Sequence, residues 1–171
     1  MNVRIFAWAM SLILLLSLCA CSGGEDPLAG SQGTAYSFTT AEGVTLTPGA
    51  KAAEALAALA HLNPTVSAGK SCLGGVDGED VTYVYPGFRV QTFRLSEGHP
   101  DEEIRWVILS DDSVATAKGI VIGASGEDVK AQYGACASET QSLLEYRSGA
   151  TLLRFGLREG RVVSISYTVA E

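Results

Sequence analysis

Apolar residues follow two kinds of pattern along this chain, an unbroken run near the start and short periodic stretches later. The run extends from Ile5 to Leu18 and is interrupted only by Ser11 and Ser17. From residue 44 onward the apolar spacing changes between three or four residues, which is typical of a helix, and two residues, which is typical of a strand. The pattern therefore separates an apolar leading segment from a folded part that contains both kinds of element.

The first periodic stretch predicts a helix followed by three strands. A helix is expected from Lys51 to Leu62 after a start at Thr47-Pro48, because threonine caps a helix and proline suits its first position. A period of two then predicts an antiparallel meander with a turn at Pro86-Gly87. Its three strands are expected at Val81–Tyr85, Phe88–Leu95 and Ile104–Leu109.

The second stretch predicts the same order of elements. Ser125 is expected to cap a short helix, Asp128 supports the same end, and Gly134 ends it. Strands are expected over residues 143–146, 151–157 and 162–167. Aligning Gly87 with Gly149 places Phe93 on Phe155 and supports an internal repeat. The expected fold is therefore α+β, with two tandem helix-plus-antiparallel-meander units, 44–118 and 119–171, in one compact domain.

Part of this pattern resembles known proteins. The run Ile122-Gly123-x-Ser125-x-x-Asp128-Val129-x-x-x-Tyr133-Gly134 is similar to the β-lactamase inhibitor protein fold and the SmpA/BamE-type outer-membrane assembly lipoproteins. The runs Tyr83-x-Tyr85-x-Gly87-Phe88 and Asp111-Asp112-Ser113-Val114-x-Thr116 also resemble a group of small Gram-positive lipoproteins. The resemblance covers about residues 44–169 and implies a sheet whose exposed face or loops bind another protein. The first predicted helix lacks the glycine that opens the second, and no inhibitor's contact residues carry over.

The leading segment is typical of an export signal. Arg4 precedes the apolar run, which ends at Leu18-Cys19-Ala20-Cys21, and this ending resembles a bacterial lipobox. The run is shorter than the ~20 residues of a membrane span. We therefore expect residues 1–20 to be a lipoprotein signal peptide and Cys21 to be acylated. An uncleaved anchor and an ordinary signal peptide are the alternatives.

A flexible tether is expected over residues 21–43, which begin with the lipidated cysteine. Glycine, serine and threonine are frequent in this segment, and its apolar residues show no period. Acyl chains on Cys21 would hold the protein in the lipid bilayer, at the extracytoplasmic face of the cell membrane. Roughly twenty coil residues reach on the order of 25 Å, which is enough to hold a domain clear of the lipid head groups.

Charge narrows the range of partners. Loss of residues 1–20 removes one arginine and no acidic residue, so the net charge moves from −7 to about −8 over 151 residues. The negative charge of such a domain makes binding to nucleic acid unfavourable, and it also opposes direct binding to anionic lipid head groups.

Two cysteines remain in the expected domain. Cys72 and Cys136 each lie between the helix and the first strand of their unit. Export permits a disulfide between them, worth roughly 4 kcal/mol in the loop-entropy model. Two separate thiols are the alternative, since equivalent loops need not be adjacent. No histidine is placed to support a catalytic thiol.

Catalytic and metal motifs are incomplete throughout. Ser67 and Lys70 have the Ser-x-x-Lys spacing, but the accompanying Lys-Thr-Gly signature is missing. His61 and His99 have no second ligand at metal spacing. The acidic run over residues 77–80 lacks the spaced oxygen ligands of a calcium loop. We therefore expect no catalytic residues, no metal and no cofactor.

Aromatic residues give the one indication of a surface. Alternation places Tyr83 and Tyr85 on one strand face, and it places Trp106 on the same face as Ile104 and Ile108. A core role is favoured, because a small sheet with one helical layer needs large inward side chains. Exposed together, these aromatic residues would instead mark a protein or glycan contact. The four candidates are Tyr83, Tyr85, Phe88 and Trp106.

These observations favour a non-enzymatic, membrane-anchored module that binds a protein partner in the cell envelope. A small-ligand or cell-wall-glycan sensor remains open as an alternative, and so does an inhibitor of an envelope hydrolase. An enzyme is the weakest of the function classes, since no nucleophile–base pair, metal set or cofactor loop is complete.

Overall fold

Strands dominate the part of the chain that the computed structural model describes, residues 35–72, 77–95 and 101–170. Cys21 and His99 lie outside these residues, as does the predicted signal peptide. The first part contains β1 (Phe38–Thr39), β2 (Thr45–Leu46), α1 (Ala53–Leu59), the 3₁₀ turn η1 (Ala60–Leu62), β3 (Thr65–Lys70), β4 (Gly78–Tyr85), β5 (Phe88–Leu95) and β6 (Glu103–Leu109). The second part contains α2 (Gly126–Tyr133), β7 (Ser138–Thr140), β8 (Leu143–Ser148), β9 (Thr151–Arg158) and β10 (Arg161–Val169).

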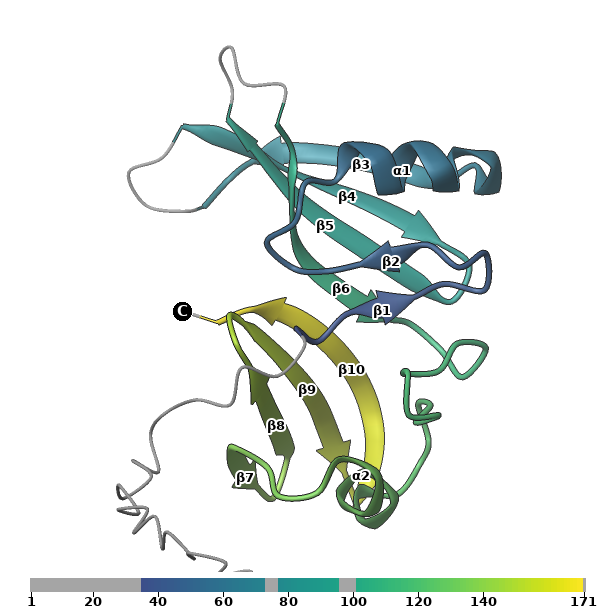
Figure 1. Ribbon diagram of the computed structural model, residues 1–171, viewed down its shortest axis with the longest axis vertical. Helices are drawn as coiled ribbons and strands as arrows, with labels where there is room; N and C mark the ends of the chain where they lie inside the picture. The colour runs from purple at the N-terminus through teal and green to yellow at the C-terminus, as the bar shows by residue number, and fades with distance from the viewer. Residues whose placement is uncertain (1–34, 73–76, 96–100, 171) are drawn as a thin grey trace, which may run out of the picture.

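Eight strands form one antiparallel sheet in the order β3-β4-β5-β6-β10-β9-β8-β7. β6 and β10 lie at its centre, where Ile165 pairs with Leu109 and Thr168 pairs with Trp106. Figure 1 shows this seam, with β3–β6 on one side and β10, β9, β8 and β7 on the other. Both parts of the chain therefore belong to the same continuous sheet.

The predicted α+β fold of two helix-plus-meander units is wrong, because the described structure is mostly β. Helix α1 has seven residues and α2 has eight, whereas one sheet of eight strands forms the body of the fold. The prediction missed the outer strands β3 and β7, whose residues are all exposed. Strands that are exposed on both faces carry no apolar alternation, so their pattern looks like that of a loop.

The first helix begins later than predicted because its expected first turn is bound to the sheet. Lys51 forms a β-bridge with Glu103, and the Ala52 amide donates to the Glu102 carbonyl at 2.7 Å. Thr47 accepts a turn hydrogen bond from the Ala50 amide instead of capping a helix. Helix α1 starts at Ala53 without a side-chain cap.

The second helix confirms the prediction from its capping residues. The Ser125 hydroxyl accepts a hydrogen bond from the Asp128 amide at 3.0 Å, and the Asp128 carboxylate accepts from the Ser125 amide at 3.2 Å. This reciprocal arrangement satisfies amide groups that have no partner within the helix. The helix ends at Tyr133, with Gly134 as its C-terminal cap at φ 77°.

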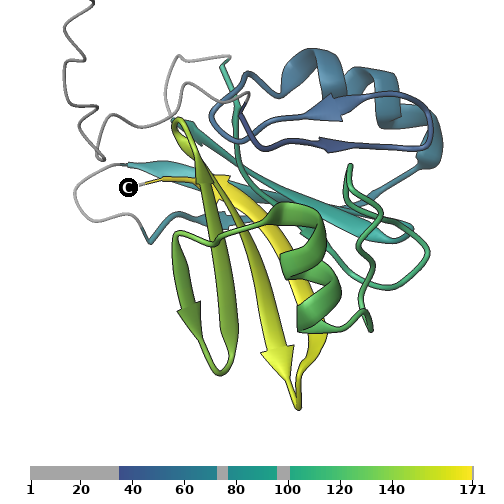
Figure 2. The ribbon, with the colours of Figure 1, turned by 60° about the horizontal axis from the view of Figure 1, so that its bottom comes forward.

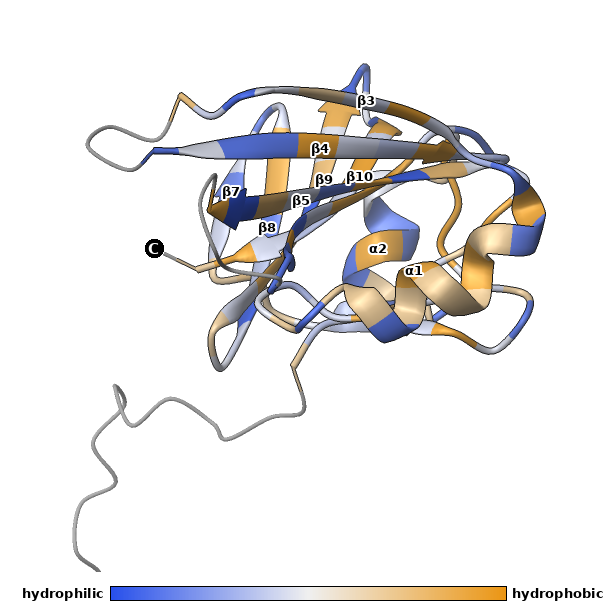
Figure 3. Cartoon of the chain, turned by 90° about the horizontal axis from the view of Figure 1, so that it is seen from above, coloured by the Kyte–Doolittle hydropathy of each residue, from blue (hydrophilic) through white to orange (hydrophobic). Residues whose placement is uncertain are grey.

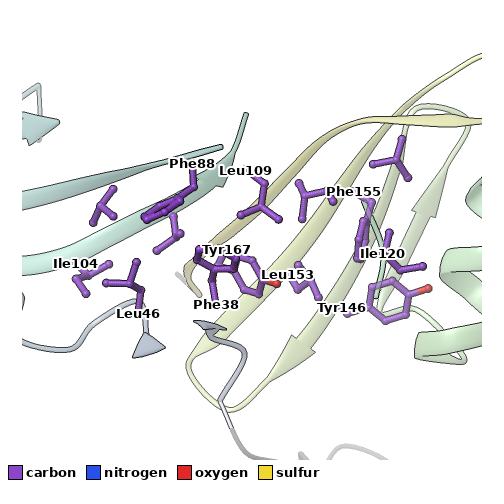
Figure 4. Packing of buried hydrophobic residues seen from close by; sticks show 14 of the residues in the cluster. Phe38, Leu46, Phe88, Ile104, Leu109, Ile120, Tyr146, Leu153, Phe155 and Tyr167 are labelled. Atoms are coloured by element: carbon purple, nitrogen blue, oxygen red, sulfur yellow. The ribbon is translucent and has the colours of Figure 1, made fainter. Parts of the chain in front are cut away.

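The core lies on one face of the sheet, beneath both helices and the β1–β2 hairpin (Figures 2 and 3). Phe38 of β1 joins its two halves, because its ring centroid lies 5.1 Å from that of Phe88 and 6.3 Å from that of Tyr167. Figure 4 shows these rings beside the Phe155 and Tyr146 cluster. A single buried cluster therefore extends across the β6–β10 seam.

Candidate binding cleft

The face of the sheet opposite the helices, called the open face below, is shaped by a β-bulge in β6. Gln91 pairs with Trp106 and the next residue, Thr92, pairs with Ile104, so Arg105 is an extra residue on β6. An extra residue reverses the alternation of side chains along a strand. Ile104 is 1% exposed in the core, whereas Trp106 is 49% exposed on the open face.

The predicted common face for Trp106 and Ile104 is therefore wrong, and the bulge is the reason. Beyond it, Val107 and Leu109 enter the core with 0% and 1% exposure, and Ile108 lies on the open face beside Arg89. The bulge directs Arg105 and Trp106 to the same face, which regular strand geometry would prevent.

A cleft of about 290 Å³ opens on this face. Its lining comes from Cys72, just after β3, and from β4, β5, β6 and β10, so it crosses the seam between the two parts of the chain. The lining residues are Cys72, Asp80, Gln91, Arg105, Trp106, Thr168 and Val169. Its volume is close to the lower end of the range for small-molecule sites, about 300–1,000 Å³.

The polar side chains of the cleft have few partners. Within the described part of the chain, Asp80, Gln91 and Arg105 form no side-chain hydrogen bond or ion pair. The Arg105 guanidinium lies over the Phe93 ring, 5.7 Å from its centroid. Elsewhere on the open face, Arg154 and Glu145 do form an ion pair, with 2.6 Å between Arg154 Nε and Glu145 Oε2. Carboxylate, amide and guanidinium groups are thus all available for hydrogen bonding beside an exposed indole.

The structure does not bring together the four aromatic residues, for which the sequence favours a core role and leaves a binding surface as the alternative. Tyr85 and Phe88 stack in the core with ring centroids 4.9 Å apart, and they are 4% and 3% exposed. Tyr83 is half-buried on the same face. Only Trp106 reaches the cleft. The sequence reasoning missed Gln91, Arg105 and Thr168, because Ile104, Arg105 and Trp106 alternate regularly in the sequence and give no signal of a bulge.

A partly buried polar network holds the chain at the start of β6. The Tyr83 hydroxyl donates to Glu102 Oε1 at 3.1 Å, and the Thr92 hydroxyl also donates to Glu102. Burial raises the pKa of Tyr83 to about 12, helped by the charge of Glu102 and by this hydrogen bond. Both donors point at one carboxylate on the core side, so the network supports the segment that precedes the bulge.

The two cysteines of the domain are free thiols. Cys72 is exposed and lines the cleft, whereas Cys136 is half-buried with its sulfur 3.6 Å from a carboxylate oxygen of Glu139. Of the two alternatives, disulfide or separate thiols, the structure has the separate thiols.

The Ser67 and Lys70 pair lies in the exposed edge strand β3. Residues three apart in a strand point to opposite faces, so this lysine is not directed at the serine hydroxyl. No group of three or more His, Cys, Asp or Glu side chains suited to a metal occurs among the described residues. Neither described α-helix has the length and apolar character that crossing a bilayer requires.

No family model, no curated protein and no solved structure matches this chain.

Proposed function

We propose that this protein is a membrane-anchored binding protein of the cell envelope that holds its ligand on the open face of the sheet. The observation that supports this proposal is the exposed Trp106 beside Asp80, Gln91 and Arg105, whose side chains form no hydrogen bond or ion pair with any described residue. Tryptophan and arginine are the residue types that most often dominate binding energy. We assign the cleft a role in binding and no step of catalysis.

The proposed anchor is the acylated Cys21, reached through the tether that precedes β1. It supports a location on the extracytoplasmic face of the membrane, because lipobox cysteines are acylated during export. Replacing Cys21 by serine should move the protein from the membrane fraction to the soluble fraction. A Cys21→Ser protein that still sediments with membranes would contradict the anchor.

A protein partner is the second candidate for the ligand, and apolar residues around the cleft favour it. Val84 and Leu95 are 45% and 37% exposed, and strand alternation places them on the same face as Asp80 and Gln91. With Trp106, three exposed apolar side chains therefore lie on this face. Exposed apolar groups with a polar surround are typical of protein interfaces.

Photo-crosslinking in intact cells tests the proposal for either kind of ligand. A benzophenone amino acid at position 106 inserts into nearby C–H bonds, and the same probe at exposed Ala57 of α1 serves as the control on the opposite face. We expect an adduct of defined mass at position 106 and none at position 57. Equal labelling at both positions, or none at position 106, would contradict a binding role for the open face.

A further inference from the structure

The cleft presents one flat apolar surface and several polar groups around it. The Trp106 indole is half exposed, and it comes from the central strand β6. Asp80 and Gln91 approach from β4 and β5, and Thr168 from β10. A ligand that fills this cleft therefore needs an apolar face to cover the indole and polar groups at its edge.

The charges of the cleft exclude strongly charged ligands. An anion would face the Asp80 carboxylate and a chain of net charge −7, whereas a cation would face the Arg105 guanidinium. A purely apolar ligand would remove water from both charges without replacing its hydrogen bonds, which costs free energy. The remaining class is a neutral ligand that both donates and accepts hydrogen bonds.

A pyranose ring has these properties. Its C–H groups form an apolar face, and its hydroxyl groups donate to carboxylates and accept from guanidinium and amide groups. Resting on the proposed function, we infer that the cleft binds a neutral sugar unit, such as a hexose or N-acetylhexosamine, stacked on Trp106 and hydrogen-bonded to Asp80, Gln91 and Arg105. A cleft of about 290 Å³ on an open face suits one or two units of a longer saccharide chain.

The fluorescence of Trp106 can be used to measure binding of a sugar. It contains two tryptophans, Trp8 and Trp106, so a Trp8→Phe protein has Trp106 as its only indole. Trp8 lies in the predicted signal peptide, so this variant has Trp106 as its only indole before and after processing. The Trp8→Phe protein, extracted in detergent, is titrated with tetramers of N-acetylglucosamine and of glucose, and the Trp106 emission is recorded. We expect a saturable change in emission with at least one of the two saccharides.

Two further substitutions leave Trp106 in place and measure how much its polar neighbours contribute to binding. Asp80→Asn and Gln91→Ala, each made in the Trp8→Phe protein, should weaken binding about tenfold, which corresponds to ~1.4 kcal/mol. Arg147→Ala, at an exposed position of β8 outside the cleft, should leave the affinity unchanged. Retention on insoluble chitin and cellulose then compares Trp106→Phe, which keeps an aromatic face, with Trp106→Ala, which should lose retention. Circular dichroism confirms that each variant is folded.

The outcomes separate this inference from the function on which it rests. No saturable change with either tetramer, together with a protein adduct of the benzophenone at position 106, would overturn the sugar ligand and leave a protein-binding role. Saccharide affinity equal to that of the parent protein in both the Asp80→Asn and the Gln91→Ala variants would also overturn it. Absence of both saccharide binding and any position-106 adduct would contradict the inference and the proposed function together.

Discussion

Two tyrosine hydroxyls are buried in the core without hydrogen-bond partners in the described structure, those of Tyr85 and Tyr167. Tyr167 is only 1% exposed, and burial raises the pKa of its hydroxyl. A buried hydroxyl without a partner costs about 1–3 kcal/mol in protein mutational data. Replacing Tyr167 by phenylalanine should therefore stabilise the fold.

The size of this effect follows from two opposing contributions. Removing one hydroxyl oxygen leaves a void of roughly 10–15 Å³, which costs about 0.3 kcal/mol at ~24 cal/mol per Å³. Relief of the unpaired hydroxyl outweighs this cost, so the free energy of unfolding should rise by about 1–2 kcal/mol. For a domain of this size the melting temperature should rise by roughly 3–7 °C.

Tyr146→Phe is the matched control, because Tyr146 is equally buried but its hydroxyl donates to the Gly134 carbonyl at 3.4 Å. Loss of that hydrogen bond should lower stability by about 0.5–1.5 kcal/mol. Urea denaturation followed by circular dichroism measures both variants. A Tyr167→Phe protein that is less stable than the parent by 1 kcal/mol or more would refute the reasoning, since its hydroxyl would then have a partner.

Three further predictions concern the tyrosines, the second helix and a tight turn. Burial raises the pKa of every tyrosine, that of Tyr83 to about 12, so stability should be full below pH ~10 and fall above it, where the unfolded tyrosines ionise first. Absorbance at 295 nm and circular dichroism should therefore change together in an alkaline titration. Ser125→Ala removes the cap of α2 and should cost about 1 kcal/mol in urea denaturation. Gly87→Ala should cost more than about 2 kcal/mol, because φ is +81° and a Cβ there would lie 2.6 Å from Ser113 Oγ. Gly149→Ala, at φ +56° with open space around it, should cost only about 1 kcal/mol in the same assay.

Each of these has a clear contrary result. Tyrosine ionisation near pH 10 with unchanged circular dichroism would show that the rings are accessible to solvent in the folded state. A Ser125→Ala protein of parental stability would mean that the cap contributes nothing measurable. Equal losses for the two glycine variants would show that the contact with Ser113 is relieved by a small movement of the chain.

Local chemistry made α2 predictable from the sequence. Ser125 and Asp128 act within one helical turn, and Gly134 ends the helix with a positive φ. The hairpin at Gly87 is local in the same sense, since Tyr85 pairs with Phe88 across it. Features that depend on contacts between distant segments were not predictable in this way. Tertiary hydrogen bonds from the segment before β6 shorten the first helix, although its apolar period extends further.

The alignment of the two units also failed at the level of strand faces. Matching Gly87 with Gly149 makes Phe93 equivalent to Phe155, yet Phe155 is fully buried in the core. Phe93 follows the buried Thr92 and lies on the opposite face, beneath the Arg105 guanidinium. A shift of one residue in register exchanges the faces of a strand, and sequence spacing alone does not resolve it.

The candidate binding cleft could not be predicted from the sequence for a related reason. Trp106 was recognised as a candidate, but regular alternation assigned it to the face of Ile104. Its partners Asp80, Gln91 and Thr168 come from three other strands, and only the pairing of β6 with β5 and β10 brings them near it.

The bulge in β6 makes chain length, as well as residue identity, a determinant of what this surface can bind. Deleting Arg105 would restore the period of two in β6, because Ile104 and Trp106 would then be neighbours on opposite faces, and it would remove one polar group from the cleft. Conversely, one inserted codon that the strand accommodates as a bulge places two consecutive side chains on the same face, while the hydrophobic residues on either side stay in the core. A binding surface can thus gain or lose a polar side chain in a single step of insertion or deletion, without a change in the packing of the core.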